Sequence, residues 1–171
     1  MERCSILHVE DHDADAYLFR AALDHAGIGI SVYRVSDGEQ ALAFLHKSGV
    51  YQKARQPDLV VLDLNMPRVD GWTVLRSVKG IAELKDVPIV VLSTSQRPED
   101  RTRSMALGAR QYLAKPSQFD DLVRVVECLC ADFLPQTINR PEIRRFRLAD
   151  RTSFEALGDS YRPAFVSGPE Q

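Results

Sequence analysis

Residues 59–67 have the sequence LVVLDLNMP, in which four consecutive apolar residues are followed at once by an aspartate, Asp63. A short, uninterrupted apolar run bounded by a turn is typical of a strand that is buried on both faces of a parallel sheet. Four further short runs are rich in β-branched or aliphatic residues, and they are 6–9, 32–35, 89–92 and 112–114. The sequence therefore predicts five buried strands.

Stretches with helical periodicity separate these runs. Apolar residues recur at spacings of three and four in four sets: Ala14, Tyr17, Leu18, Ala21 and Ala22; Ala41, Phe44 and Leu45; Val74, Leu75 and Val78; and Leu122, Val125, Val126 and Leu129. A further helix is expected before Gly108. Asp13 and Asp37 are expected N-caps, and Gly27 and Gly49 are expected to end the first two helices.

Strands that alternate with helices predict an α/β fold with a five-stranded, parallel, doubly wound sheet over about residues 3–134. Beyond residue 134 the composition changes, because residues 135–171 contain 4 prolines and carry 6 Arg against 5 acidic residues. We expect one domain over 1–134 and a C-terminal extension, 135–171, that forms no independent domain.

The overall composition excludes several classes of protein. The 171 residues include 22 Lys+Arg and 24 Asp+Glu, and this near-neutral balance argues against a protein that coats nucleic acid or anionic lipid. No apolar run approaches the roughly 20 residues that span a bilayer, and an acidic N-terminus does not suit a signal peptide. We expect a soluble cytoplasmic protein, without a membrane or nucleic-acid partner.

Polar residues follow four of the predicted strands. They are Glu10 and Asp11 after the first strand, Asp63 and Asn65 after the third, Ser93 after the fourth, and Lys115 after the fifth. Because the carboxyl ends of parallel strands meet at one edge, these side chains should converge there. Clustered carboxylates repel each other unless a cation lies among them, and Mg²⁺ prefers such oxygen ligands. At a strand end, Asp63 is also placed as a nucleophile that could form an acyl phosphate.

Four separated motifs resemble the receiver domain of bacterial two-component response regulators. They are Glu10-Asp11, the segment Asp63-Leu64-Asn65-Met66-Pro67 with Asp70-Gly71, Ser93, and Lys115-Pro116. The resemblance covers residues 3–134 and implies a flavodoxin-like receiver fold. It also implies that Asp63 is the phosphoacceptor and that Mg²⁺ is held by Glu10, Asp11, Asp63 and the backbone carbonyl of Asn65.

The same resemblance gives roles to three further residues. Ser93 would hydrogen-bond the phosphoryl group, Lys115 would neutralise its charge, and Tyr112 would be the aromatic residue that changes rotamer with Ser93 in the switch. The Lys115–Pro116 peptide bond resembles one that is cis in the family. Such a protein is not an enzyme in the usual sense, because it catalyses only its own phosphorylation and slow dephosphorylation.

Finer features are similar to phytochrome-associated, single-domain regulators. They are the segment 92–96, the set Ala41, Phe44 and Leu45 after Asp37-Gly38, and the end of the last helix at 132–134. The implied partner is a sensor histidine kinase such as a bacteriophytochrome. The implied output is a changed surface around the fourth helix, fifth strand and fifth helix, which acts on another protein or another copy.

A phosphatase of the haloacid dehalogenase type is the alternative, with Asp63 as its nucleophile. Two features count against it. That family has a second aspartate two positions after the nucleophile, where this chain has Asn65, and its acidic pair follows the nucleophile, whereas Glu10 and Asp11 precede Asp63.

The C-terminal extension combines charge with apolar residues. The run 144–147 contains three arginines, and a solvated charge run is the favoured interpretation over a nucleic-acid patch. Nearby apolar residues (Ile143, Phe146, Phe154 and Leu157) suggest docking on the domain or on a partner. Together with Phe133-Leu134, which a monomer is expected to leave partly exposed, they favour a homodimer through the C-terminal third, the alternative being a monomer with its tail folded back.

Overall fold

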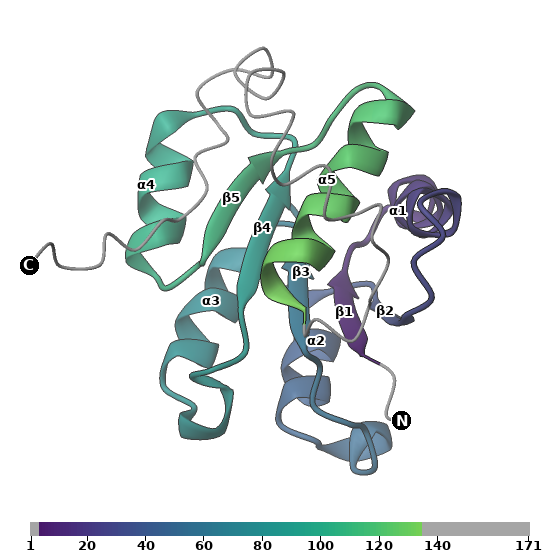
Figure 1. Ribbon diagram of the computed structural model, residues 1–171. Coiled ribbons are helices and arrows are strands. Elements are labelled where there is room, and N and C mark those ends of the chain that lie inside the picture. Colours follow the sequence, from purple (N-terminus) through teal and green to yellow (C-terminus); the bar gives the residue numbers. More distant parts are fainter. Residues whose placement is uncertain (1–3, 135–171) are drawn as a thin grey trace, which may run out of the picture.

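The computed structural model describes residues 4–134, so the expectations for the extension 135–171 lie outside the described residues. Five parallel strands form one sheet in the order β2-β1-β3-β4-β5 (Figure 1). The strands are β1 (Ser5–Val9), β2 (Ser31–Val35), β3 (Leu59–Leu62), β4 (Ile89–Ser93) and β5 (Gln111–Ala114). The five predicted strands and their parallel arrangement are confirmed, with ends that differ by a residue at most.

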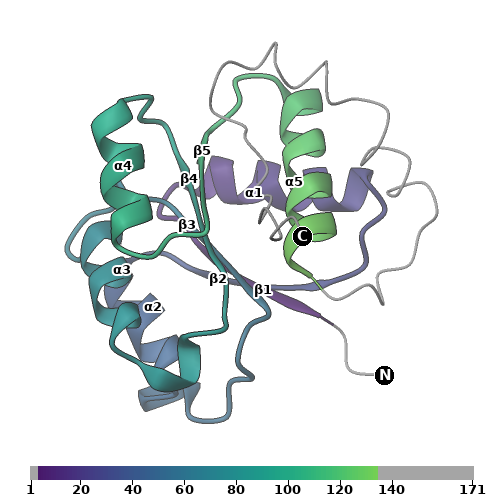
Figure 2. The ribbon, with the colours of Figure 1, turned by 60° about the vertical axis from the view of Figure 1, so that its left-hand side comes forward.

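Helices cover both faces of this sheet (Figure 2). On one face lie α1 (Asp13–His25) and α5 (Phe119–Phe133), and on the other lie α2 (Gly38–Leu45), α3 (Gly71–Lys79) and α4 (Pro98–Ala106). Two short 3₁₀ helices, η1 (Gly49–Tyr51) and η2 (Ala82–Leu84), follow α2 and α3. The predicted doubly wound α/β fold is therefore confirmed.

Alternate strand residues supply the two cores. In β1, for example, Ile6 packs with the α1 and α5 side chains, whereas Leu7 packs with those of α2 and α3. This alternation follows from the pleat, which points successive side chains to opposite faces. Because both faces are covered, every residue of β1, β3 and β4 is buried, which explains why β3 is apolar throughout and why β1 and β4 are mostly apolar, with Ser5, His8 and Ser93 as buried polar exceptions.

The buried face of α1 differs from the predicted one. Tyr17 and Leu18, expected to face the core, are exposed, and the residues that are buried are Ala16, Phe19, Ala22 and Leu23. Both sets have helical spacing, so periodicity alone could not separate them. Phe19 decides the orientation, because its ring stacks on the buried imidazole of His8 at a centroid distance of 4.2 Å.

Two of the four predicted helix boundaries are wrong. Asp37 caps α2 as expected, since its carboxylate accepts a hydrogen bond from the backbone N–H of Gln40 at 2.8 Å, but the N-cap of α1 is His12 rather than Asp13. Gly27, at φ +64°, follows the C-cap of α1 as expected. Lys47, at φ +52°, takes the left-handed position after α2 that was expected of Gly49.

Among the α-helices of residues 4–134, α4 has the fewest buried residues. Only Ser104 is buried among its nine residues, and the hydroxyl of Ser104 donates to the carbonyl of Asp100 within the same helix. Two side-chain contacts join α4 to α3. The Arg103 guanidinium lies 4.2 Å from the centre of the Trp72 ring, and the Lys79 ammonium donates to the carbonyl of Ala106 at 3.2 Å.

The end of α5 also departs from expectation. Leu134 is buried in the core formed with α1 and α5, and Phe133 packs against the same core. The expectation that a monomer leaves both side chains partly exposed is therefore wrong for Leu134 and right for Phe133, which is partly buried. Among residues 4–134, no helix is long and apolar enough to span a bilayer.

Candidate functional site

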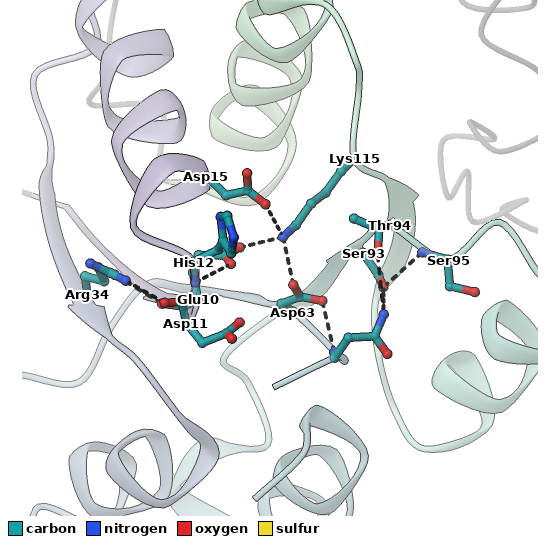
Figure 3. Close-up of polar contacts among 11 residues, drawn as sticks. Glu10, Asp11, His12, Asp15, Arg34, Asp63, Ser93, Thr94, Ser95 and Lys115 are labelled. Carbon is teal, nitrogen blue, oxygen red and sulfur yellow. Dashed lines mark hydrogen bonds and ion pairs between the residues drawn. The ribbon is translucent and has the colours of Figure 1, made fainter. Parts of the chain in front are cut away.

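Three carboxylates meet at the carboxyl edge of the sheet (Figure 3). Glu10 and Asp11 follow β1, and Asp63 follows the neighbouring strand β3, so the strand order itself brings them together. Each of these three residues has one carboxylate oxygen that lies within 4.8 Å of a carboxylate oxygen of the other two. Glu10 and Asp63 are only 1% and 5% exposed. This set of hard oxygen donors fits a divalent cation such as Mg²⁺.

The ammonium of Lys115 lies among the carboxylates, as Figure 3 shows. Its nitrogen donates to Glu10 at 2.7 Å, to Asp63 at 2.7 Å and to Asp15 at 2.8 Å. The predicted convergence of Lys115 with the acidic group is thus observed. Asp15, from the first turn of α1, was not predicted, because an aspartate just inside a helix is ordinarily explained by the helix dipole.

These contacts determine the charge of the site. Burial by itself would lower the pKa of Lys115, but hydrogen bonds to Asp15, Asp63 and Glu10 outweigh it and raise that pKa above its usual value. Lys115 is therefore charged at neutral pH. Burial raises the pKa of Glu10, against the opposing effect of Lys115, because removing a carboxylate from water penalises its ionised form.

Arg34 of β2 binds the acidic loop after β1, which consists of residues 10–13. Its guanidinium donates to the backbone carbonyls of Glu10 and Asp11, both at 3.1 Å, and pairs with Asp13 at 2.6 Å. The backbone N–H of His12 donates to the Glu10 carboxylate at 3.0 Å. Sequence reasoning missed Arg34, since an arginine in an edge strand carries no local signal of a long-range contact.

The buried imidazole of His8 adds no positive charge below this site. Burial, together with the smaller effects of the charges of Lys115 and Arg34, lowers the pKa of His8 to about 3. The ring is neutral at physiological pH and is stacked on Phe19, so His8 is a core residue.

A second set of polar contacts starts at the other side of Asp63. The backbone N–H of Asn65 donates to the Asp63 carboxylate at 3.1 Å, and the Asn65 amide donates to the Ser93 hydroxyl at 3.4 Å. The Ser93 hydroxyl also accepts from the backbone N–H of Ser95 at 3.3 Å. Asn65 and Ser93 therefore lie beside Asp63, as predicted.

The contacts continue from Ser95 to Tyr112 and α4. The Tyr112 hydroxyl donates to the Ser95 carbonyl at 2.8 Å, and the Ser95 hydroxyl donates to Asp100 of α4 at 2.6 Å. Tyr112 is buried, and burial raises the pKa of its hydroxyl. The ring of Tyr112 therefore points inward, and hydrogen bonds link the surroundings of Asp63 to the first turn of α4.

The expected cis peptide bond between Lys115 and Pro116 is wrong. That bond is trans. The backbone N–H of Lys115 donates to the carbonyl of Ser93 at 2.7 Å, and from this position at the end of β5 the side chain reaches the carboxylates.

Gly71 packs closely against the backbone of Asp63 and Leu64. The N–H of Gly71 donates to the carbonyl of Leu64 at 3.1 Å, and Asp70 caps α3 by accepting from the backbone of Thr73 at 2.8 Å. A Cβ atom on Gly71 would lie 2.4 Å from the carbonyl oxygen of Asp63 and 2.8 Å from the Cα of Leu64. Since both obstacles are backbone atoms, only glycine fits here.

We therefore expect Gly71→Ala to lower the free energy of unfolding by about 2 kcal/mol, because overpacking of this kind forces the backbone to move. Urea denaturation measures the change. Gly80→Ala, at the other end of α3, is the matched control, since a Cβ there lies 3.8 Å from its nearest neighbour and the backbone is right-handed. Equal stabilities of the two variants would contradict the close approach at Gly71.

Comparisons with known proteins agree with this geometry. Residues 6–127 match the family described as the response regulator receiver domain. The chain is 37% identical over 136 residues to the response regulator Rcp1 of Synechocystis, covering 80% of this chain and 92% of Rcp1.

Two solved structures are similar to this one. The phosphorylated cyanobacterial phytochrome response regulator RcpA is 36% identical with a TM-score of 0.74, covering 79% of this chain and 96% of RcpA. The Mn²⁺-bound form of Rcp1 is 37% identical with a TM-score of 0.70, covering 77% of this chain and 94% of that one.

Proposed function

The chain belongs to the response regulator receiver-domain family, and we propose that it is a single-domain response regulator phosphorylated on Asp63 by a sensor histidine kinase. The observation that carries this proposal is the position of Asp63. Its carboxylate is almost fully buried at a strand end, lies in hydrogen-bonding contact with the Lys115 ammonium, and is adjacent to Glu10 and Asp11.

The proposed reaction is a phosphoryl transfer to a carboxylate oxygen of Asp63. A P–O bond forms as the P–N bond of the kinase phosphohistidine breaks, and the imidazole nitrogen keeps the electron pair of that bond. Lys115 would stabilise negative charge on the phosphoryl oxygens, since its ammonium already contacts Asp63. The backbone N–H of Asn65, which donates to Asp63, would help to orient the attacking carboxylate.

Mg²⁺ is the proposed cofactor, and Glu10, Asp11, Asp63 and the backbone carbonyl of Asn65 are the proposed ligands. Bound Mg²⁺ would supply positive charge against the phosphoryl oxygens. Support comes from the close approach of the three carboxylates and from a similar protein, Rcp1, whose structure is described as Mn²⁺-bound. Without a divalent cation, one ammonium, that of Lys115, is paired with three carboxylates, those of Glu10, Asp15 and Asp63.

Ser93 and Tyr112 are the proposed switch residues. A phosphoryl group on Asp63 would accept a hydrogen bond from the Ser93 hydroxyl, and a turn of Ser93 toward it would disturb the contacts in which the Ser93 oxygen now accepts from Asn65 and Ser95. Because the Ser95 carbonyl accepts from Tyr112 and the Ser95 hydroxyl donates to Asp100, a shift of Ser95 would reach α4. The proposed output is a changed surface at α4, β5 and α5.

The likeness to RcpA, which is described as a cyanobacterial phytochrome response regulator, supports a kinase of the phytochrome type, such as a bacteriophytochrome. We also propose a receiver domain over 1–134, a cytoplasmic location, and no enzymatic activity on other molecules. The haloacid dehalogenase alternative has no support. Asn65 stands where its general acid would be, and the Asn65 amide is directed at Ser93 and Thr94.

Acetyl phosphate, a small phosphoryl donor, tests the function directly. Incubation with acetyl phosphate and Mg²⁺ should add one phosphoryl group per chain, measured by intact-protein mass spectrometry, and the modified residue should be Asp63. Incubation with p-nitrophenyl phosphate should release no more than about one nitrophenolate per chain in the same period. Many turnovers of this ester would instead identify a phosphatase.

We further propose a homodimer through α4, β5 and α5, since Met105 of α4 and Phe119 of α5 are large apolar residues that are exposed in the single chain. Sedimentation velocity at micromolar concentration should show a dimer that beryllofluoride strengthens. Met105→Asp should weaken it, because a charge would be buried at the interface. Val50→Asp, at another exposed apolar position, in η1, is the control. A monomer under every condition would reject the dimer.

A further inference from the structure

Lys115 has all of its hydrogen-bonding capacity in use. An ammonium carries three N–H donors, and here each is matched by a carboxylate, from Glu10, Asp15 and Asp63, at 2.7 to 2.8 Å. Figure 3 shows the three carboxylates arranged around the nitrogen. A group attached to Asp63 can take over the N–H that now points to the Asp63 carboxylate, but it can gain a second hydrogen bond from Lys115 only if Glu10 or Asp15 gives one up.

The three carboxylates differ in how easily they could be released. The side chains of Glu10 and Asp63 are 1% and 5% exposed, whereas the side chain of Asp15 is 35% exposed. A carboxylate that loses its partner in the protein interior keeps an unpaid desolvation penalty, but one at the surface is hydrated at once. Asp15 is therefore the acceptor that Lys115 can leave at the lowest cost.

Asp15 differs from Glu10 and Asp63 in its place in the fold. Glu10 and Asp63 lie at the ends of adjacent strands, and their carboxylate oxygens lie close to each other and to an oxygen of Asp11. Asp15, in contrast, belongs to α1 and is connected to these carboxylates through Lys115. Within residues 4–134, the side chain of Asp15 pairs with Lys115 and makes no hydrogen bond to Asp63, Ser93 or Asn65. Asp15 can therefore affect Asp63 either through their shared partner Lys115 or through the negative charge of the Asp15 carboxylate.

We propose that Asp15 is a positioning residue that holds the Lys115 ammonium while Asp63 is unmodified and competes with the phosphoryl group for it afterwards. This inference rests on the proposed function of Asp63. The Asp15 carboxylate then lowers the stability of the phosphorylated site, because it draws a hydrogen bond of Lys115 away from the phosphoryl group. A substitution that removes the charge of Asp15 and keeps its shape should strengthen the hydrogen bonds from Lys115 to a phosphoryl group. The affinity of the site for a phosphoryl mimic should then rise rather than fall.

The test is the binding of beryllofluoride, a stable mimic of a phosphoryl group on aspartate, in the presence of saturating Mg²⁺. The dissociation constant can be measured from the tryptophan fluorescence of Trp72 or from amide chemical shifts. Asp15→Asn should bind about fivefold more tightly than the wild type, the factor that a partly exposed ion pair can contribute. Asp15→Glu, which keeps a carboxylate within reach of Lys115, should stay close to the wild-type value.

A control variant separates this competition from a general effect of charge. Asp120→Asn removes the same charge from an exposed position in the first turn of α5, five residues after Lys115. It should leave the dissociation constant unchanged. Equal tightening in Asp120→Asn and Asp15→Asn would overturn the inference, because net charge would then explain both.

The sign of the change distinguishes competition from a structural role. If Asp15 only stabilised the site, Asp15→Asn would bind beryllofluoride more weakly, and weaker or unchanged binding overturns the inference while leaving the function of Asp63 intact. If the wild type itself binds no beryllofluoride, the proposed function fails, and this inference fails with it. Tighter binding by Asp15→Asn alone supports it.

Discussion

Replacement of Asp63 by asparagine is expected to abolish phosphorylation by acetyl phosphate completely. An amide oxygen is a far weaker nucleophile than a carboxylate and cannot form the acyl phosphate. The side chains have the same shape, and Asp63 is almost fully buried, so the fold should be kept. Intact-protein mass spectrometry after incubation with acetyl phosphate and Mg²⁺ should show one added phosphoryl group in the wild type and none in the variant.

Asp24→Asn gives the matched control for this experiment. Asp24 lies on α1, where it pairs with Arg20 at the surface, and its replacement removes the same charge far from the acidic group. This variant should be phosphorylated like the wild type. A phosphoryl group found on Asp63→Asn would show that another residue is the nucleophile.

Lys115→Ala should produce the largest loss of stability among single changes at the site. Removing the ammonium leaves the buried carboxylates of Glu10 and Asp63 without their cation, and uncompensated buried charges typically cost about 3 kcal/mol or more. Urea denaturation without divalent cations should show this loss. Mg²⁺ should recover much of it, because a cation that binds the native state stabilises it by mass action.

Lys79→Ala is the control for Lys115→Ala. Lys79 also uses its ammonium, as a donor to the carbonyl of Ala106, but its side chain lies at the surface. Its replacement should change the free energy of unfolding by less than about 1 kcal/mol. If the two variants were equally stable, or if Mg²⁺ gave Lys115→Ala no greater benefit than the wild type, the electrostatic description of the site would be wrong.

The strands and most of the site could be predicted because each has a strong local cause. A strand buried on both faces is mostly apolar, so the uninterrupted apolar runs 59–62 and 89–92 of β3 and β4 are distinctive in the sequence. Once the sheet is parallel, residues just beyond Val9, Leu62 and Ala114 must share one edge. The meeting of Glu10, Asp63 and Lys115 therefore follows from topology.

The missed features depend on side-chain contacts between distant elements. Nothing near Asp15 or Arg34 in the sequence indicates that one contacts Lys115 and the other the acidic loop. The face of α1 was predicted wrongly because two sets of residues fit a helix equally well, and the stacking of Phe19 on His8 selects one of them. Tertiary packing decided each of these cases, and local propensity could not.

The shallow packing of α4 has a consequence for how a signal could spread through the protein. Elements with few buried side chains open locally at a lower free energy than the core, and they change position without disrupting the rest of the fold. With Ser104 as its one buried residue, α4 has little hydrophobic anchoring to lose. The hydrogen bonds at Ser95 and Asp100 therefore make up a larger share of the attachment of α4 than they would for a deeply buried helix, so that a small event beside Asp63 can change which conformations of α4 are populated.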